Sequence, residues 1–304
     1  MEGKLCQICG SPTISAGTVT GRIVGRRFRL RHCPACRFSF VENPLDPRFV
    51  YDKEYYEGRG ADPLVDYTGE VRDVTRTIRV YEWRGITNAV ATLTALGPGT
   101  RWLDFGCGTG GLVRHVRDTV GAEAWGFEQG EAERLAASAG TPLIRRDELV
   151  STKGSFDVIT AIEVVEHMPR PVEEFQEMRK LVRPGGLLFL TTGNARPYRG
   201  RIAEWRYVIP EIHVSFFEPI TLAMALTVAG FEPAYPGFVA GYTDIIRFKI
   251  LKNLGRRRRS RLEAFVPWSL AARLVDWRLG VSAHPVGWAR NASVSASAPG
   301  VPMS

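Results

Sequence analysis

The sequence predicts an α/β fold, in which a mostly parallel sheet of seven strands is flanked by helices and preceded by a small cysteine-rich module. Three observations predict this architecture. From residue 86 onward, short apolar runs alternate with helical patterns, which is typical of parallel strands joined by crossover helices. A glycine-rich loop follows the first of these runs. Four of the five cysteines lie in two CxxC pairs near the N-terminus.

Composition indicates a folded protein with one large core and a small appendage, since the chain has 304 residues and 44% of them are hydrophobic. The first ten residues, MEGKLCQICG, hold no apolar run of the kind found in signal peptides. No segment approaches the ~20 apolar residues that a membrane-spanning helix needs. We therefore expect a cytoplasmic location. The net charge of +8 favours anionic partners, which include nucleic acid, phosphorylated substrates and acidic lipid surfaces.

The first element in the chain is the cysteine module, predicted to span residues 1–40. Its two CxxC pairs are 23 residues apart and consist of Cys6, Cys9, Cys33 and Cys36. This arrangement is typical of four thiolates around one structural Zn²⁺, with two disulfides or free thiols as the alternatives. The arginine-rich segment 22–31 has alternating apolar positions, which predict short strands. We expect a zinc-ribbon-like module.

Residues 41–85 are predicted to be a linker and a lid, because this segment begins with two prolines that favour extended backbone. Its aromatic residues are candidates for the lid, with simple packing as the alternative: Tyr51, Tyr55, Tyr56 and Tyr67.

The main domain is predicted over residues 86–253. The predicted strands are residues 102–105, 124–128, 143–145, 156–162 and 187–192, with edge strands at 231–235 and 244–250. The predicted helices are residues 86–96, 112–120, 131–138, 172–182 and 220–229. Glycines close the first and last of these helices, as is common at helix C-termini.

The glycine loop is a candidate ligand site, because it presents backbone N–H groups between a buried strand and a helix. Gly106, Gly108 and Gly111 fit the G-x-G-x-x-G pattern, which by itself does not distinguish a nicotinamide cofactor from S-adenosylmethionine. The carboxylate of Asp104 would oppose a pyrophosphate but suits a ligand that carries an ammonium group and a sulfonium. Glu128 ends the next strand, where it can accept hydrogen bonds from ribose hydroxyls.

Four blocks of this domain resemble the class I S-adenosylmethionine-dependent methyltransferase superfamily. They read LDFGCGTG, GFEQG, SFDVITAIEVVEHMPRP and LVRPGGLLFLTT, cover about residues 101–192 and stand in that family's order. The resemblance implies a Rossmann-like fold, S-adenosylmethionine as cofactor and methyl transfer as the reaction.

The resemblance also implies cofactor-binding roles for Asp104, Gly106, Gly108, Glu128, Asp147, Ala161, Ile162 and Glu163. Asp104 and Gly106 would face the methionine portion, and Glu128 would hold the ribose. Either Asp147 or Glu148 would approach the adenine amino group, and the residues that end the fourth strand would line the pocket.

His213 is the candidate catalytic residue. Methyl transfer is an in-line displacement, so the protein mainly positions the reactants and supplies a base where the acceptor must lose a proton. The segment PEIHVSFFEP resembles the E-H-x-S-Y-F segment of deoxysugar C-methyltransferases, whose histidine is the base. Ile212 and Phe216 depart from that pattern, which favours O-methylation of a sugar or glycan hydroxyl over C-methylation. A packing or substrate-contact role is the alternative for His213.

The acceptor has two candidate classes, because similar zinc modules precede sugar or glycan-pathway methyltransferases and also ribosomal RNA guanine methyltransferases. We expect a small-molecule or glycan acceptor. The rival is an RNA methyltransferase or an RNA-binding protein that uses the arginines of the cysteine module. Nucleic acid is the less favoured partner, because no N-P-P-Y-like signature follows the fourth strand.

Residues 254–290 are predicted to be a basic, amphipathic helical segment. An arginine run at 256–259 precedes an apolar-rich stretch, which favours either peripheral contact with a membrane or a helix packed on the main domain. Residues 291–304 are small and polar, and we expect them to be disordered.

Overall fold

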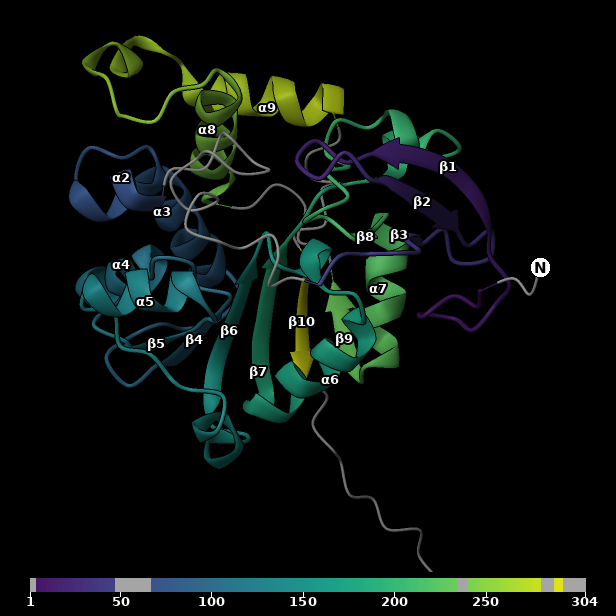
Figure 1. The fold of residues 1–304 in the computed structure, drawn as a ribbon. Coiled ribbons are helices and arrows are strands. Elements are labelled where there is room, and N and C mark those ends of the chain that lie inside the picture. The colour runs from purple at the N-terminus through teal and green to yellow at the C-terminus, as the bar shows by residue number, and fades with distance from the viewer. Residues whose placement is uncertain (1–3, 47–66, 235–239, 280–286, 292–304) are drawn as a thin grey trace, which may run out of the picture.

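The computed structural model describes residues 4–46, 67–234, 240–279 and 287–291. Its centre is a six-stranded sheet (Figure 1). In spatial order the strands are β5 (Glu123–Phe127), β4 (Arg101–Phe105), β6 (Phe156–Ile162), β7 (Val182–Thr191), β10 (Gly287–Asn291) and β9 (Phe231–Ala234). The first four are parallel, and β10 runs antiparallel to both of its neighbours. The predicted α/β architecture with a mostly parallel sheet is therefore confirmed.

The predicted strand at 143–145 is reduced to an isolated parallel bridge between Gly126 and Leu143. This bridge lies at the β5 edge, where a seventh strand would continue the sheet.

Helices cover both faces of the sheet, because strand residues alternate between the two sides. Trp102 and Phe189 pack toward α3 (Arg79–Ala91), α4 (Gly111–Val120) and α8 (Tyr242–Asn253). Leu103 and Leu188 pack toward the opposite layer of α6 (Pro171–Leu181) and α7 (Pro219–Val228). The remaining described α-helices are α2 (Tyr67–Arg72), α5 (Glu131–Ser138) and α9 (Trp268–Leu279). Short 3₁₀ turns are η2 (Glu148–Thr152), η3 (Val165–His167), η4 (Arg196–Tyr198), η5 (Ile202–Glu204) and η6 (Arg261–Phe265).

The predicted edge strand at 244–250 is wrong, because these residues belong to helix α8. Its buried positions Ile245, Phe248 and Leu251 recur at helical spacing. A short apolar run does not by itself distinguish a strand from a buried helix. The helix forms because it packs closely on α3, where a Cβ on Gly85 would lie 2.7 Å from the carbonyl oxygen of Gly241.

The C-terminal part of the chain also differs from the prediction. Residues 287–290 were expected in a helical segment and Asn291 in a disordered tail, but 287–291 form β10 between β7 and β9. The strand is short and has no alternating apolar pattern. Its pairing with β9 and with β7, which is distant in the sequence, therefore determines its structure. The predicted helix in this segment does occur, as α9. The rest of the predicted tail, and three of the four lid tyrosines (Tyr51, Tyr55 and Tyr56), lie outside the described residues.

The cysteine module contributes three strands to a second, antiparallel sheet: β1 (Ile14–Thr20), β2 (Arg27–His32) and β3 (Ser39–Val41). The fourth strand, β8 (Ser215–Phe216), comes from the main domain and pairs with β3. Two further contacts join the same regions. The Thr221 hydroxyl donates to the Cys36 carbonyl at 2.7 Å, and the rings of Phe38 and Phe217 lie 5.2 Å apart. The module is therefore continuous with the segment that follows His213.

Among the described helices, none combines the length and apolar character needed to cross a membrane.

Candidate functional site

A cleft of about 1410 Å³ lies at the carboxyl ends of the parallel strands. This is the position where open α/β sheets bind their ligands. Six of the predicted cofactor-binding residues line it: Asp104, Gly106, Gly108, Glu128, Ile162 and Glu163. His213, the predicted catalytic residue, lines the same cleft. The structure thus brings together residues that lie as far as 109 positions apart, since the cleft includes both Asp104 and His213.

The glycine loop forms the floor of one end of the cleft. Gly106 and Gly108 have φ angles of 75° and 55°, in the left-handed region where a side chain is strained. A Cβ on Gly106 would also lie 2.6 Å from the Val164 side chain. Glycine is therefore required at both positions for the loop to keep this path into α4.

Glu128 closes the loop from the neighbouring strand. Its two carboxylate oxygens accept hydrogen bonds from the backbone N–H groups of Gly108 (2.8 Å) and Gln129 (2.9 Å). Burial raises the pKa of this carboxyl group, although both hydrogen bonds act in the opposite direction. Both oxygens keep lone pairs that can accept further hydrogen bonds from hydroxyl groups of a ligand.

Asp104 is buried beside the loop and is 4% exposed. Its Oδ1 accepts a hydrogen bond from the Thr160 hydroxyl at 2.7 Å. Burial raises the pKa of Asp104 to about 7, because the charged form is desolvated and Glu128 is nearby. Two acidic groups at this end of the cleft favour a ligand that carries positive charge.

The raised pKa of Asp104 predicts a stabilising substitution. Folding raises the pKa of Asp104 because burial penalises its charged form. The resulting loss of stability is absent below the ordinary pKa of 3.8 and complete above about pH 7. Asp104→Asn keeps the acceptor for Thr160 and removes this cost. We expect the free energy of unfolding to increase by at most about 4 kcal/mol at pH 8 and by less than about 1 kcal/mol at pH 4.

Urea unfolding of both proteins at the two pH values measures this difference. Glu123→Gln, which changes an exposed carboxylate on β5, is the matched control. An Asp104→Asn gain that is equal at both pH values would contradict the assignment of the effect to a buried charge.

Two of the predicted cofactor-binding residues lie elsewhere. Ala161 is fully buried beneath the cleft and does not line it. The side chain of Asp147 is 75% exposed, forms an ion pair with Arg145 at 3.4 Å and is also absent from the lining. Asp147 lies in the turn that immediately precedes η2, and its neighbour Arg146 lines the cleft.

Glu163 lines the cleft, but its carboxylate is already bound within the protein. Lys249 donates to Oε1 at 2.9 Å, and the Thr191 hydroxyl donates to the same atom at 3.0 Å. Burial alone would raise the pKa of Glu163, but the charge of Lys249 outweighs it and holds the pKa well below its usual range. Glu163 is therefore a fixed anion in the cleft wall.

Tyr207 extends this wall and Glu166 is buried behind it, and the sequence prediction missed both. The Tyr207 hydroxyl donates to Glu166 and also lies 3.2 Å from Glu163 Oε2. The Thr192 hydroxyl donates to the other Glu166 oxygen at 2.6 Å. Burial, followed by the charge of Glu163, raises the pKa of Glu166 to about 7. The E-x-x-E-H block at 163–167 was a signal that could have identified Glu166, whereas nothing local identified Tyr207 or Lys249.

His213 lines the same cleft as the glycine loop and is 6% exposed. Its Nδ1 donates to the Tyr207 carbonyl at 2.6 Å, its ring stacks on the Tyr207 ring at 4.2 Å, and the His167 ring lies 4.9 Å away. Burial, with His167 as the next cause, lowers the pKa of His213 to about 3. The ring is therefore neutral near pH 7, and with the proton on Nδ1 its Nε2 is a hydrogen-bond acceptor.

Two groups of described side chains have the geometry to hold a metal ion. In each, the ligand atoms lie within 4.8 Å of one another. The first is the set Cys6, Cys9, Cys33 and Cys36, and the second is Glu166, His167 and His213. In the second group the Glu166 oxygens already accept hydrogen bonds from Thr192 and Tyr207. We interpret that group as a hydrogen-bonded network and the cysteines as the candidate metal centre.

Comparison with known proteins places this geometry in context. A family model described as a methyltransferase domain matches residues 75–235. The ubiquinone biosynthesis O-methyltransferase of Ralstonia nicotianae is 31% identical over 159 residues, which cover 46% of this chain and 66% of that protein. The protein of the same name from Pseudomonas aeruginosa is 34% identical over 109 residues, which cover 33% of this chain and 47% of that protein. The chain thus spans about half to two thirds of the length of these relatives.

Among solved structures, a chain from the complex between the Haloferax volcanii Trm112 methyltransferase activator and a methyltransferase is similar. Its TM-score is 0.50 at 16% sequence identity, over 75% of this chain and 96% of that one. At this identity the similarity shows a shared fold alone.

Proposed function

The chain belongs to the methyltransferase-domain family, whose model matches more than half of it, and from this premise we propose that it methylates a hydroxyl group of a small-molecule acceptor with S-adenosylmethionine as the methyl donor. The observation that carries the proposal is that one cleft is lined by two chemically different groups of residues. The glycine loop, Asp104 and Glu128 form an anionic group, here called the anionic end, and His213, with its Nε2 as an acceptor, defines what we call the acceptor end.

The donor fits the anionic end by its chemistry, because its ammonium and sulfonium groups are cationic. When bound, S-adenosylmethionine supplies an activated methyl group to a nucleophile. Asp104 offsets the positive charge of the ligand, Glu128 accepts hydrogen bonds from the ribose hydroxyls, and Gly108 allows close approach of the backbone.

The acceptor hydroxyl would donate its hydrogen bond to Nε2 of His213, which takes the proton as the oxygen attacks the methyl group. The Tyr207 carbonyl holds the opposite ring nitrogen and fixes the tautomer for this role. Glu163 and Lys249 neutralise each other beside the reactants, so the wall adds little net charge there. The names of the curated relatives support oxygen as the methylated atom.

A sugar or glycan-pathway metabolite is the acceptor class that we propose. This proposal rests on the resemblance of the segment PEIHVSFFEP to deoxysugar methyltransferases. The rings of Trp205 and Tyr207 also line the cleft, but they are stacked on each other and on Tyr198 and His213, so their faces are already in contact with protein. The names of the relatives favour a second candidate, an intermediate of ubiquinone biosynthesis. A turnover screen of both classes, with radiolabelled methyl donor, distinguishes them.

We further propose that the four cysteines hold a structural Zn²⁺. The Sγ atoms of Cys6 and Cys36 lie 3.4 Å apart, and those of Cys9 and Cys33 lie 3.5 Å apart. A tetrahedron with Zn–S bonds of about 2.3 Å needs sulfur separations of about 3.8 Å, which is close to this geometry. Four protein ligands leave no open position, which favours a structural role.

Glu128→Ala should weaken S-adenosylmethionine binding by about 100-fold, because it removes the proposed ribose acceptor and leaves the Gly108 N–H without its partner. Calorimetric titration of the purified protein measures the dissociation constant, which we expect to be micromolar for the wild type. Asp147→Ala is the matched control and should bind as the wild type does, because Asp147 points away from the cleft. If the folded wild type fails to bind the donor, the proposed function is wrong.

A further inference from the structure

The segment from Leu254 to Leu274, here called the C-terminal strap, combines exposed apolar side chains with arginines. It follows the family-matched region and contains six arginines and a single acidic residue, Glu263. Among the described residues, six of the fourteen exposed large apolar side chains fall within it: Leu254, Leu262, Phe265, Val266, Leu270 and Leu274. Such a concentration on a surface is typical of an interaction site.

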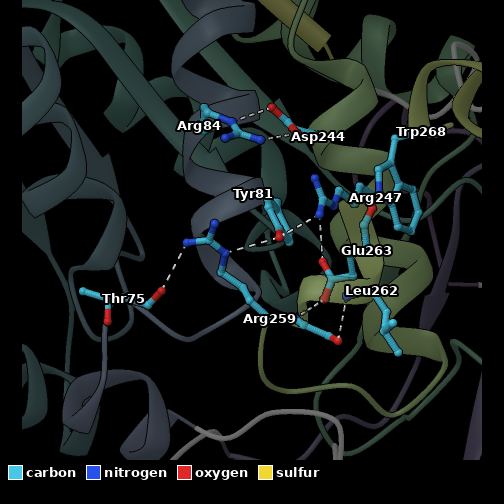
Figure 2. Close-up of polar contacts among 10 residues, drawn as sticks. Thr75, Tyr81, Arg84, Asp244, Arg247, Arg259, Leu262, Glu263 and Trp268 are labelled. Atoms are coloured by element: carbon cyan, nitrogen blue, oxygen red, sulfur yellow. Dashed lines mark hydrogen bonds and ion pairs between the residues drawn. The ribbon is translucent and has the colours of Figure 1, made fainter. Parts of the chain in front are cut away.

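The inner face of the strap is anchored by the contacts in Figure 2. Glu263 is buried and accepts a hydrogen bond from Arg247 at 2.9 Å, and the Trp268 ring N–H donates to the Glu263 carbonyl at 2.8 Å. The Arg247 guanidinium lies 3.7 Å from the centre of the Tyr81 ring and 4.9 Å from that of Trp268. Arg259 adds a hydrogen bond to the Tyr81 hydroxyl at 3.2 Å.

These contacts determine which side chains face outward. Glu263 and Trp268 point toward α3 and α8, whereas Leu262 is 75% exposed and Phe265 is 84% exposed. On α9, Leu270 and Leu274 are one helical turn apart and both exposed. The apolar side chains are thus held outward by a rigid attachment and cannot turn inward without breaking it.

The charge of the strap selects among possible partners. A symmetric interface between two copies would place the six arginines of one strap against those of the other, and like charges repel. Nucleic acid would be bound by the arginines without any need for exposed leucine and phenylalanine. Basic residues beside exposed apolar side chains match an anionic bilayer surface, which binds both.

The strap also adjoins the cleft, because Arg256, Arg257 and Arg258 line its rim. Figure 1 shows α8 and α9 beyond the carboxyl ends of β6 and β7. The residues that line the cleft also lie at the carboxyl ends of the parallel strands. We propose that the C-terminal strap docks the protein onto a bilayer rich in anionic phospholipid, with Leu262 and Phe265 inserted and the arginines other than Arg259 on the headgroups. Docking would place the mouth of the cleft next to the bilayer, where an amphiphilic acceptor could enter the cleft. Only this entry of an acceptor rests on the proposed function.

Co-sedimentation of the full chain with vesicles tests the proposal without donor or acceptor. We expect binding to phosphatidylcholine vesicles that contain about 30% phosphatidylglycerol, and much weaker binding to phosphatidylcholine alone. Leu262→Ser with Phe265→Ser should reduce the binding constant by about tenfold or more. Arg256→Ala with Arg258→Ala should reduce it by about fivefold for each charge removed.

The control is Ile220→Ser with Val228→Ser, which removes two exposed apolar side chains from α7, outside the strap. It should bind vesicles as the wild type does. Equal losses in the control and in the strap variants would overturn the proposal. Failure of the wild type to bind anionic vesicles would also overturn it. In that case, a wild-type dimer that the strap variants dissociate would point to a second copy as the partner, and oligonucleotide binding would point to nucleic acid.

Discussion

Replacing Cys36 with serine should abolish methyl transfer and lower the midpoint of thermal unfolding by more than about 10 °C. Structural zinc contributes on the order of 10 kcal/mol in small zinc-binding folds, which is comparable to the entire stability of a typical domain. The loss should reach the acceptor end of the cleft, because β3 pairs with β8 two residues after His213. The Ile23 N–H also donates to Glu211 at 2.9 Å, on the other side of that histidine.

Zinc content, thermal unfolding and turnover, measured on the same preparations, check this expectation. Cys107→Ser is the matched control for zinc content, since Cys107 lies in the glycine loop and outside the four-cysteine cluster. It should keep one zinc ion per chain. A zinc-free Cys36→Ser protein with the wild-type unfolding midpoint and turnover would show that the cysteines do not support the fold.

His213→Ala should lower kcat by about 10² to 10⁴, the contribution typical of a positioned general base. Binding of S-adenosylmethionine should change by less than about twofold, because the substituted ring lies at the acceptor end of the cleft. Since burial lowers the pKa of His213 to about 3, its neutral form persists across the range from pH 5 to pH 8. Protonation of His213 should therefore produce no fall in rate within that range.

Steady-state kinetics and calorimetry on the same variants separate a base from a packing residue. His213→Gln keeps a hydrogen-bonding group near the position of Nε2 but cannot take a proton near pH 7, so it should be as slow as the alanine variant. His115→Ala, on α4 and outside the cleft lining, is the control and should be as active as the wild type. Recovery of turnover by the glutamine variant would assign His213 a positioning role.

The elements that the sequence predicts well are those with strong local patterns. Strand β6 and helix α5 have the predicted boundaries, because an apolar run and an amphipathic repeat define them. Helix α8 and strand β10 were mispredicted, because close packing on α3 and pairing with β7 and β9 determine their structures. Neither partner can be read from the local residues.

The same division holds for the candidate site. The glycine loop follows β4 and Glu128 follows β5. Because these two strands are parallel neighbours, their carboxyl ends lie side by side and bring the loop and Glu128 together. Lys249 reaches Glu163 from α8 across 86 positions of sequence, and Tyr207 reaches Glu166 across 41. Such pairs form through tertiary packing, which leaves no spacing signal. Asp147 was expected directly after a third strand, whereas it immediately precedes the 3₁₀ turn η2 and lies outside the cleft lining.

The insertion of β10 between β7 and β9 has a consequence for how the chain folds. Trp288 pairs with Phe189, so this ladder closes a loop of about 100 residues, and contacts of such long range slow folding. Until residue 291 has been synthesised, β7 and β9 have no strand between them, and their unpaired backbone groups are open to other chains. The nascent protein therefore passes through a stage in which its main sheet is split, and during that stage we expect it to be most prone to aggregation.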